Sequence, residues 1–532
     1  MSALIRNPQE QEICDRFQVS HLAGKLLAAS GLSDDQIREL LDQDAALSTS
    51  RAECVQACAR RIQKARENHE KVFIGGDYDA DGITATAILK DTLDQLGIEN
   101  GYYIPDRFRE GYGLKPETVA AAAEKGYSLI ITVDNGVSAF AAAEKALSLG
   151  LDIIITDHHE IGTPVTASLL VHPSLMEPQY AFLSGAGVAL QISRTLLGEV
   201  KAHTGLAAVA AIADVMPLWR ETRRIVKNGM ACLRQNAVPA VTAMMAPGSA
   251  VNPTTLSFQV IPKLNSVGRM SDLSNVNTLV RYLLLKDERA IAAYTLQLNQ
   301  VNDARKTLSG GMARQAEALL SDDPFEILFD PGFHEGICGL VAGRIASSTH
   351  KPTLVMAENG DLIKGSGRSV PGFNLYGFFQ QDFDDLLQGF GGHEMAVGIS
   401  VEKQDFEAFS ARVQQKMAAS GYSYEPPQDT AIEIDPALMT MPEISDLQNL
   451  EPLPKELGKP LFAIRSPLVM NRFESPKVLK YTCRNAQGSY EAVLYRRLNL
   501  EEPEAPALIY GTLSINRWRN QIIPQMEIQG LE

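Results

Sequence analysis

The segment from residue 72 to residue 86 constrains this chain more than any other. It begins with three apolar residues, which predict a buried strand, and two glycines end that run. Asp77, Asp79 and Asp81 follow at alternate positions, and a helical pattern resumes over residues 83–96. The carboxylates therefore lie on a turn at the carboxyl end of a strand, where α/β folds place their ligands. Carboxylates this close repel one another unless a cation is bound between them. The alternative is a solvated acidic turn or an Asp-rich helix N-terminus.

Three more apolar runs end in residues of the same kind. Residues 127–133, 151–156 and 207–213 are followed, respectively, by Asp134, by Asp157-His158-His159 and by Asp214. Any one of these clusters could be a capped loop, but four of them indicate a site, and we expect them to converge on one edge of a sheet. A mixed set of Asp and His favours manganese or magnesium over a thiolate-type zinc site.

The same clusters resemble the motifs of a known superfamily. Asp77-Tyr78-Asp79-Ala80-Asp81-Gly82, Val133-Asp134-Asn135-Gly136, Asp157-His158-His159 and Ala213-Asp214-Val215 are similar to the four motifs of the DHH phosphoesterases. Within that superfamily the later segments resemble the RecJ family of single-strand exonucleases in order and spacing, over roughly residues 70–400. These segments are Asp106-Arg107, 110–114, 264–270, 333–337, 365–369 and 389–398.

The alternation of strand-like and Ala-rich helical runs from about residue 70 to 225 predicts βαβ units and a parallel sheet with helices on both faces. Together with the resemblance, this pattern predicts an α/β protein of five parts. These are a helical lead-in that packs against the first domain (1–68), a DHH catalytic domain (69–225), a helical connector with a long helix (226–320), a smaller α/β DHH-associated domain that closes over the site (321–425), and an OB-like β-barrel (426–532).

The resemblance also assigns roles to individual residues. It implies two Mn²⁺ or Mg²⁺ ions, with Asp79 on one, Asp81 on the other and Asp134 bridging both. His158 and Asp214 complete the second metal, and Asp77 and His159 lie in or beside the shell. Pyrophosphatase-type members have a histidine four residues before the position of Asp79, where this chain has Gly75, as RecJ-like members do. The first metal is therefore expected to be weaker or more hydrated.

Two further groups are predicted to contact nucleic acid. Glycine-rich settings and the resemblance indicate a phosphate-gripping set, because backbone amides, hydroxyls and guanidinium groups suit phosphate oxygens; it consists of Arg269, Ser366, Arg368 and His393. The tail interleaves cations with aromatic residues, which is typical of surfaces for single strands, and its candidates are Arg472, Lys480, Tyr481, Arg496, Arg497 and Trp518. The alternative for the tail is exposed cations beside core aromatics.

The net charge of −15 is unusual for a nucleic-acid binder, because affinity for DNA comes largely from neutralising phosphates. It argues against a loose coating protein, although a local groove can still be positive. The six cysteines have no Cys-x-x-Cys spacing, which predicts neither disulfides nor structural zinc. The lack of a long apolar run or a basic-then-apolar N-terminus predicts a cytoplasmic protein without membrane segments.

The resemblance implies a metal-dependent exonuclease that degrades single-stranded DNA from the 5′ end during repair and recombination. It would be a monomer, with single-stranded DNA as substrate and a helicase or a single-strand-binding protein as candidate partners. Two alternatives stay open. One is a phosphodiesterase for short oligonucleotides or cyclic dinucleotides, but such proteins are shorter or membrane-tethered and lack a barrel. The other is an inactive replication scaffold, which would have lost metal ligands; apart from Gly75, none is lost here.

Overall fold

The computed structural model describes residues 3–5, 10–42, 46–108, 110–111, 113–425, 430–495, 503–518 and 521–532. The chain divides into two compact units. The larger comprises Leu47–Met216 and Ile225–Pro426, and the smaller comprises Met1–Ala46, Pro217–Arg224 and Pro427–Glu532. Within the described ranges, no helix combines the length and the apolar character needed to cross a membrane.

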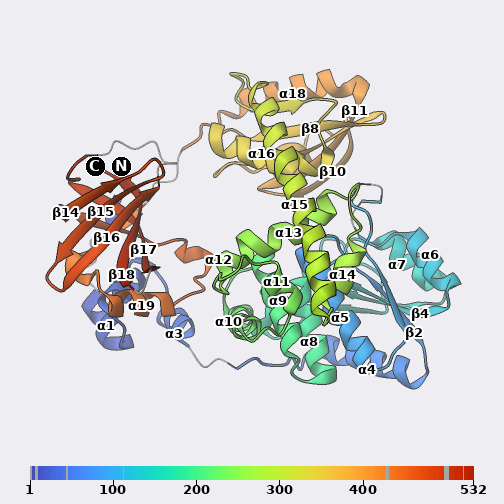
Figure 1. Ribbon diagram of the computed structural model, residues 1–532. Helices are drawn as coiled ribbons and strands as arrows, with labels where there is room; N and C mark the ends of the chain where they lie inside the picture. The colour runs from blue at the N-terminus through green and yellow to red at the C-terminus, as the bar shows by residue number, and fades with distance from the viewer. Residues whose placement is uncertain are drawn as a thin grey trace. The chain divides into compact units, whose positions relative to one another are not determined.

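A five-stranded parallel sheet forms the first half of the larger unit, with the order β3-β2-β4-β5-β6. Its strands are β2 (Lys71–Gly75), β3 (Asn100–Tyr103), β4 (Tyr127–Val133), β5 (Asp152–Thr156) and β6 (Leu169–Val171). One face is covered by α6 (Pro116–Glu124) and α7 (Phe140–Ser148), and the other by α4 (Glu53–Glu67), α5 (Ala80–Gln95) and α8 (Gly185–Leu197) (Figure 1). The predicted parallel α/β sheet with helices on both faces is confirmed.

The apolar run before Asp214 is a helix, α9 (Lys201–Ala213), and Asp214 is its C-terminal capping residue. The expectation that every acidic cluster would follow a run at the sheet edge is wrong here. The run is rich in alanine, which has the highest helix propensity, and periodicity cannot separate a short buried strand from a buried helix. Because α9 packs against α5 and α8, its C-terminus still reaches the other clusters.

The connector is helical, as predicted. It contains α10 (Arg220–Arg234), α11 (Pro239–Ala243), α12 (Pro253–Thr255), the π-helix η3 (Leu256–Val260), α13 (Ile261–Arg269), α14 (Asn277–Leu283) and α15 (Glu288–Glu317). Asp287 caps α15, which runs for 30 residues and is therefore about 45 Å long. This helix packs against α13 and against α16 (Glu335–Thr349), so it joins the first half of the larger unit to the second.

The second half of the larger unit is built on a mixed sheet with the order β10-β11-β9-β8-β7. Its strands are β7 (Glu326–Phe329), β8 (Thr353–Asn359), β9 (Leu362–Arg368), β10 (Leu387–His393) and β11 (Ala396–Glu402), packed with α16, α17 (Leu375–Gln380) and α18 (Phe406–Ser420). The sequence did not indicate β10, because three of its seven residues are glycine, which is depleted in strands. This strand lies at the edge of the sheet.

The smaller unit is an eight-stranded sheet with the order β1-β12-β13-β17-β18-β16-β15-β14. Its strands are β1 (Ala3–Ile5), β12 (Thr430–Glu433), β13 (Leu461–Arg465), β14 (Leu468–Glu474), β15 (Val478–Asn485), β16 (Gly488–Tyr495), β17 (Leu508–Trp518) and β18 (Gln521–Leu531). Strand β1 pairs with β12, and the backbone amide of Ser20 donates to Asp446. Residues 1–46 therefore belong to the smaller unit, whereas α4 packs against α8 and β6 of the larger unit. That residues 1–46 pack against the first domain stays a prediction.

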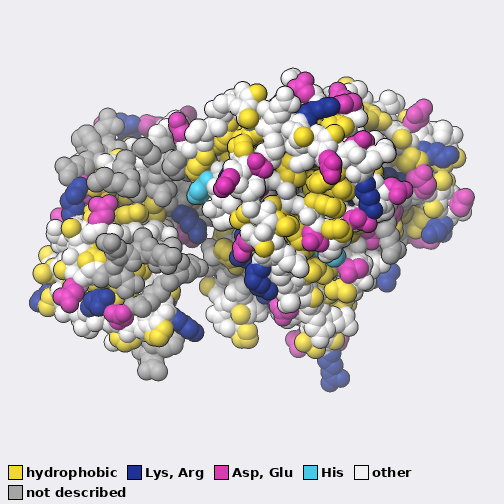
Figure 2. All heavy atoms as spheres, turned by 90° about the horizontal axis from the view of Figure 1, so that it is seen from above, with side chains coloured by type: hydrophobic (Ala, Val, Ile, Leu, Met, Phe, Trp, Pro, Cys, Tyr) yellow, Lys and Arg dark blue, Asp and Glu magenta, His cyan; other side chains and the backbone are white. Residues whose placement is uncertain are grey.

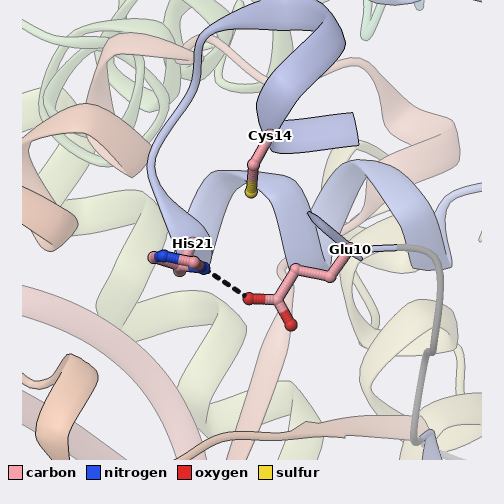
Figure 3. Close-up of side chains that lie close together, drawn as sticks. All are labelled: Glu10, Cys14 and His21. Atoms are coloured by element: carbon pink, nitrogen blue, oxygen red, sulfur yellow. Dashed lines mark hydrogen bonds and ion pairs between the residues drawn. The ribbon is translucent and has the colours of Figure 1, made fainter. Parts of the chain in front are cut away.

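The helices α1 (Glu10–Phe17), α2 (His21–Ala29), α3 (Asp34–Leu41) and α19 (Met441–Asn449) complete the smaller unit. Three side chains of α1 and α2 resemble a metal-ligand set in composition: Glu10, Cys14 and His21 (Figure 3). His21 Nδ1 lies 2.9 Å from Glu10 Oε1, Glu10 also pairs with Lys25, and the Cys14 thiol donates to the carbonyl of Ser20. Protein groups account for all three, and we assign no metal to them.

Basic and acidic side chains are interspersed on the face of the molecule seen in Figure 2. That face shows no continuous basic stripe, in keeping with a net charge of −15.

Candidate metal centre

The first acidic cluster lies where β2 passes into α5. Asp79 caps α5 by accepting the backbone N–H of Gly82 at 3.0 Å, and Asp81 lies in the first turn. The positive end of the helix dipole stabilises carboxylates at this end. At Gly82, a Cβ would lie 2.6 Å from the backbone oxygen of Asp77, so only glycine allows the turn to close this tightly.

The N-terminus of α8 holds the Asp81 carboxylate in place and lies directly against Asp134. The Asp81 carboxylate accepts the backbone N–H groups of Gly185 and Ala186, both at 2.7 Å. At Gly185, a Cβ would lie 2.5 Å from the Cβ of Asp134, so the helix approaches Asp134 as closely as glycine permits. The helix thus fixes the side chain of Asp81 and the position of Asp134.

Asp134 and His158 bring the strand ends together. Asp134 directly follows β4 with φ of 61°, a left-handed conformation that Asp tolerates better than most residues. His158 Nε2 lies 3.1 Å from Asp134 Oδ1, 3.7 Å from Asp81 Oδ2 and 3.6 Å from Asp214 Oδ2. One imidazole therefore faces three carboxylates that come from three different segments of the chain.

The potential ligands form two adjacent groups. In each group, the ligand atoms lie within 4.8 Å of one another: Asp77, Asp79 and Asp134 in the first, and Asp81, His158 and Asp214 in the second. Asp134 also groups with His158, which places it between the two sets. In the described part of the chain, Asp77 Oδ1 is buried without a hydrogen-bond partner. Oxygen-rich sets with one imidazole suit Mn²⁺ or Mg²⁺, so these residues fit the predicted pair of cations.

The electrostatics of the cluster show why a cation is needed. Burial, followed by repulsion from Asp79, raises the pKa of Asp81 to about 8 and that of Asp214 to about 6. Burial and neighbouring carboxylates also raise the pKa values of Asp77 and Asp134. Burial lowers the pKa of His158 to about 4, so its imidazole is neutral near pH 7, the state in which it can ligate a metal.

His159 differs from His158 in charge. Burial opposes its protonation, but a 2.8 Å hydrogen bond between His159 Nδ1 and Asp157 Oδ1 prevails and raises the pKa of His159 to about 9. Asp157 is held in turn by the backbone N–H groups of Val137 and His158. Asp157 was not among the predicted site residues, although it begins the Asp-His-His motif. It makes His159 a cation beside the metal ligands.

A cavity of about 990 Å³ opens next to the metal ligands. It is lined by Asp79 and His159 and by all four residues of the predicted phosphate-gripping set, Arg269, Ser366, Arg368 and His393. Arg269 ends α13, Ser366 and Arg368 lie on β9, and His393 ends β10. The structure thus brings residues from both halves of the larger unit to one cavity.

The arginines of this cavity repel one another. Burial, followed by Arg107 and Arg368, lowers the pKa of Arg269 to about 10, and burial with Arg107 lowers that of Arg368. Arg107 also lines the cavity, with its guanidinium 5.1 Å from the ring centroid of Tyr78. The sequence placed Arg107 in a family-like segment, Asp106-Arg107, but indicated no role for it. Guanidinium groups gathered in this way favour an anion such as phosphate.

The tail residues that were predicted to contact nucleic acid lie in different environments. Tyr481 is fully buried and its hydroxyl donates to the carbonyl of Pro503, so the prediction that its ring stacks on a base is wrong. Lys480 pairs with Glu491, and Arg472 pairs with Glu474. Three further predictions fall outside the described residues: Arg496, Arg497 and the side chain of Trp518.

Comparison with known proteins identifies the family. Three family models match: the DHH family N-terminal domain over residues 71–216, the DHHA1 domain over 322–419 and the RecJ OB domain over 430–530. The single-stranded-DNA-specific exonuclease RecJ of Escherichia coli (strain K12) is 32% identical over 77% of each chain. That of Salmonella typhimurium (strain LT2) is 31% identical over the same shares. The chain belongs to the RecJ family.

Other RecJ proteins extend the comparison. RecJ of Bacillus subtilis (strain 168) is 32% identical over 88% of this chain, and the chain spans 62% of that relative's length. The crystal structure of RecJ from Thermus thermophilus in complex with Mn²⁺ has a TM-score of 0.84, with 27% identity over 100% of this chain and 78% of that one. A manganese-bound exonuclease RecJ has a TM-score of 0.62, with 32% identity over 72% of this chain and 98% of that one. The predicted fold class, including the OB domain, is confirmed.

The raised carboxylate pKa values predict how stability depends on pH in the metal-free protein. Between about pH 6.5 and about pH 8, Asp81 and His159, whose folded pKa values are about 8 and about 9, hold more protons folded than unfolded. Stability should therefore fall as the pH rises through this window. We expect the thermal midpoint of the EDTA-treated protein to fall as the pH rises through this window. In Asp81→Asn the midpoint should fall less steeply with pH, because asparagine does not titrate.

The control is Asp361→Asn, an exposed turn residue between β8 and β9, which should keep the wild-type slope. Added Mn²⁺ should raise the wild-type midpoint more at the upper end of the window, where the carboxylates are more fully ionised. An Asp81→Asn slope equal to that of wild type would contradict this electrostatic account.

Proposed function

We propose that this RecJ-family chain is a metal-dependent exonuclease that degrades single-stranded DNA from the 5′ end. The observation that carries the proposal is the pair of ligand sets that meet at Asp134, open to a cavity lined by arginines. Relatives that share 77% of their length with this chain are named single-stranded-DNA-specific exonucleases, which supports the choice of substrate.

The ligand sets suggest a division of labour. Asp77 and Asp79 would hold one divalent cation, Asp81, His158 and Asp214 the other, and Asp134 both. Two such ions, when bound, clamp the scissile phosphate and lower the pKa of a water molecule that attacks it. Because His158 is neutral and His159 is charged near pH 7, His158 serves as a ligand. His159, fixed by Asp157, is available to donate a proton to the leaving oxygen from the cavity wall.

The arginine side of the cavity suits a terminal phosphate. Arg269, Ser366, Arg368 and His393 line the same cavity as Asp79, so a phosphate held by the former lies within one cavity of the metal ligands. Anchoring the chain end in this way would place the next phosphodiester at the metals, which is what an exonuclease requires. The 5′ polarity rests on the family resemblance.

The alternative functions are less well supported. An inactive scaffold would have lost ligands, whereas all six predicted metal ligands are present and fall into the two sets. Phosphodiesterases for short oligonucleotides lack a C-terminal barrel, whereas residues 430–530 of this chain match the RecJ OB domain. Arg472 and Lys480 remain candidates for contacts with long strands in that domain. A helicase or single-strand-binding partner, a monomeric state and a cytoplasmic location stay predictions.

The first test is hydrolysis of single-stranded DNA labelled at either end, in the presence of Mn²⁺. The wild-type protein should release nucleotides from the 5′ end, and Asp134→Asn should be slower by roughly a thousand-fold or more, because both cations lose charge stabilisation worth several kcal/mol. The metal-free variant should unfold at the wild-type temperature or above, since one like charge has been removed from the cluster.

The matched control for Asp134→Asn is Asp330→Asn, an acidic residue that also directly follows a strand, β7, in the other half of the larger unit. It should retain wild-type activity. Release from the 3′ end, or substantial Mn²⁺-dependent activity in Asp134→Asn, would refute the proposed function.

The second test concerns the terminal phosphate. Arg368→Ala should raise KM about 10- to 100-fold for strands with a 5′-phosphate, the range expected for losing a hydrogen bond to a charged group. Strands with a 5′-hydroxyl should be affected little. The control is Arg344→Ala on α16, whose side chain is exposed and pairs with Glu317. Equal losses on both kinds of end would remove Arg368 from a terminal-phosphate role.

A further inference from the structure

A buried chain of hydrogen bonds ties together three helices of the first half of the larger unit. The imidazole of His203, near the start of α9, donates from Nε2 to the Asp91 carboxylate of α5 at 2.8 Å. Its Nδ1 shares a hydrogen bond of 2.7 Å with the Ser193 hydroxyl of α8. His203 is fully buried and Ser193 is 1% exposed. The two contacts of this imidazole therefore reach two different neighbouring helices.

A serine, a histidine and an aspartate in this order also occur in hydrolases, where the histidine activates the serine hydroxyl as a nucleophile. Burial excludes that role here, because a substrate would have to reach the hydroxyl of Ser193 between packed helices. The Asp91 side chain is 30% exposed, and the hydrogen bond from His203 lowers its pKa. Its carboxylate is therefore ionised near pH 7, and the hydrogen bond is a strong, charge-assisted one.

All three helices lead from this hydrogen-bond chain to the second ligand set, and they lie side by side (Figure 1). Helix α5 begins at the metal centre with Asp81 in its first turn, and α8 begins with the two amides that bind Asp81. Helix α9 ends there, because Asp214 is its C-terminal capping residue. Eleven residues separate His203 from Asp214, which is about 16 Å along the helix axis. The chain thus links the far ends of the helices whose near ends carry these ligands.

The rest of the α9 surface offers little to fix the helix along its axis. Residues 205–211 are all buried, and five of these seven are glycine or alanine. Small side chains form shallow ridges, so packing alone resists sliding of the helix weakly. A buried polar side chain must instead meet its partners, which is how such residues fix register in helical assemblies. In α9, His203 supplies this constraint.

We propose that His203 is a positioning residue for the second cation. Through Asp91 and Ser193 it sets the register of α9 against α5 and α8, and with it the place of Asp214 relative to the other ligands of that ion. Metal ligands need placement to within about 0.5 Å, and carboxylates that repel one another do not adopt it unaided. This inference rests on the proposed function, which assigns Asp214 to the second ion, and deepens it by naming what holds that ligand in place.

The test is equilibrium binding of Mn²⁺ to the full-length, metal-depleted protein, measured by calorimetry in two backgrounds. Asp79→Asn impairs the first ligand set, so the ion that still binds reports the second set. There, His203→Leu should weaken Mn²⁺ binding roughly ten-fold or more, as the loss of a supporting hydrogen bond does at metal sites. Asp214→Asn impairs the second set, so the remaining ion reports the first, and His203→Leu should leave its affinity unchanged.

The matched control is Thr92→Val. Thr92 adjoins Asp91 on α5 and is as buried as His203, but its hydroxyl donates to the carbonyl of Ile88 within the same helix. It should leave both affinities unchanged. His203→Gln should restore most of the lost affinity, because its amide can donate to Asp91 and accept from Ser193. If His203→Leu lowers the thermal midpoint, Asp91→Ala takes its place, since the Asp91 side chain reaches the surface.

Undiminished Mn²⁺ affinity in the Asp79→Asn background would overturn the proposal. So would an equal loss in both backgrounds, or a His203→Gln variant as weak as His203→Leu, because the substitution would then loosen the whole unit and not displace Asp214 alone. None of these measurements involves hydrolysis. A protein that shows the site-selective loss but degrades no single strand would refute the proposed function and leave the positioning role of His203 standing.

Discussion

Repulsion among buried carboxylates is the constraint on which the larger unit depends. Asp77, Asp81 and Asp134 are each at most 3% exposed, and burial and mutual repulsion raise the pKa of every one of them. The chain offsets part of this cost with the N-terminus of α5, the two amides of α8 that bind Asp81, and the glycines that let these elements approach. Bound cations are needed to offset the rest of the repulsion among the carboxylates. The sheet, the helix ends and the glycines of this half therefore make sense together as the frame of a metal centre.

A second cluster of opposite charge faces the first. Arg107, Arg269 and Arg368 repel one another at one side of the cavity, and Asp79 favours the charged form of Arg269 from the other. The phosphate of the proposed substrate would satisfy both clusters, because phosphate oxygens can bind guanidinium groups and cations alike. Helix α15 packs against both α13 and α16, so it links the half that supplies the carboxylates to the half that supplies Ser366 and Arg368. The site depends on that link as much as on its own residues.

Much of the site could be predicted because strands end where their apolar runs end, and parallel strands share one edge; this placed Asp77 to Asp81, Asp134 and His158 correctly beside one another. The features that the sequence did not reveal have identifiable physical causes. An alanine-rich run before Asp214 fits a helix as well as a strand, and three of the seven residues of β10 are glycine, which is depleted in strands. Tyr481 shows that composition cannot tell a stacking ring from a buried one. The placement of residues 1–46 depends on β1 pairing with β12, more than 420 positions away, which no local pattern reveals. The hydrogen bond between Asp157 and His159 depends on how the two side chains are oriented, which the sequence does not show.

The central claim is that the carboxylate clusters are held together by two cations that share Asp134. The most direct test is the number of Mn²⁺ ions bound at equilibrium by the metal-depleted protein, determined by calorimetry together with elemental analysis of the dialysed complex. The account predicts two ions for each wild-type chain, and fewer than two for Asp134→Asn under the same conditions. A wild-type protein that binds one ion or none, or an Asp134→Asn variant that binds two with wild-type affinity, would contradict it.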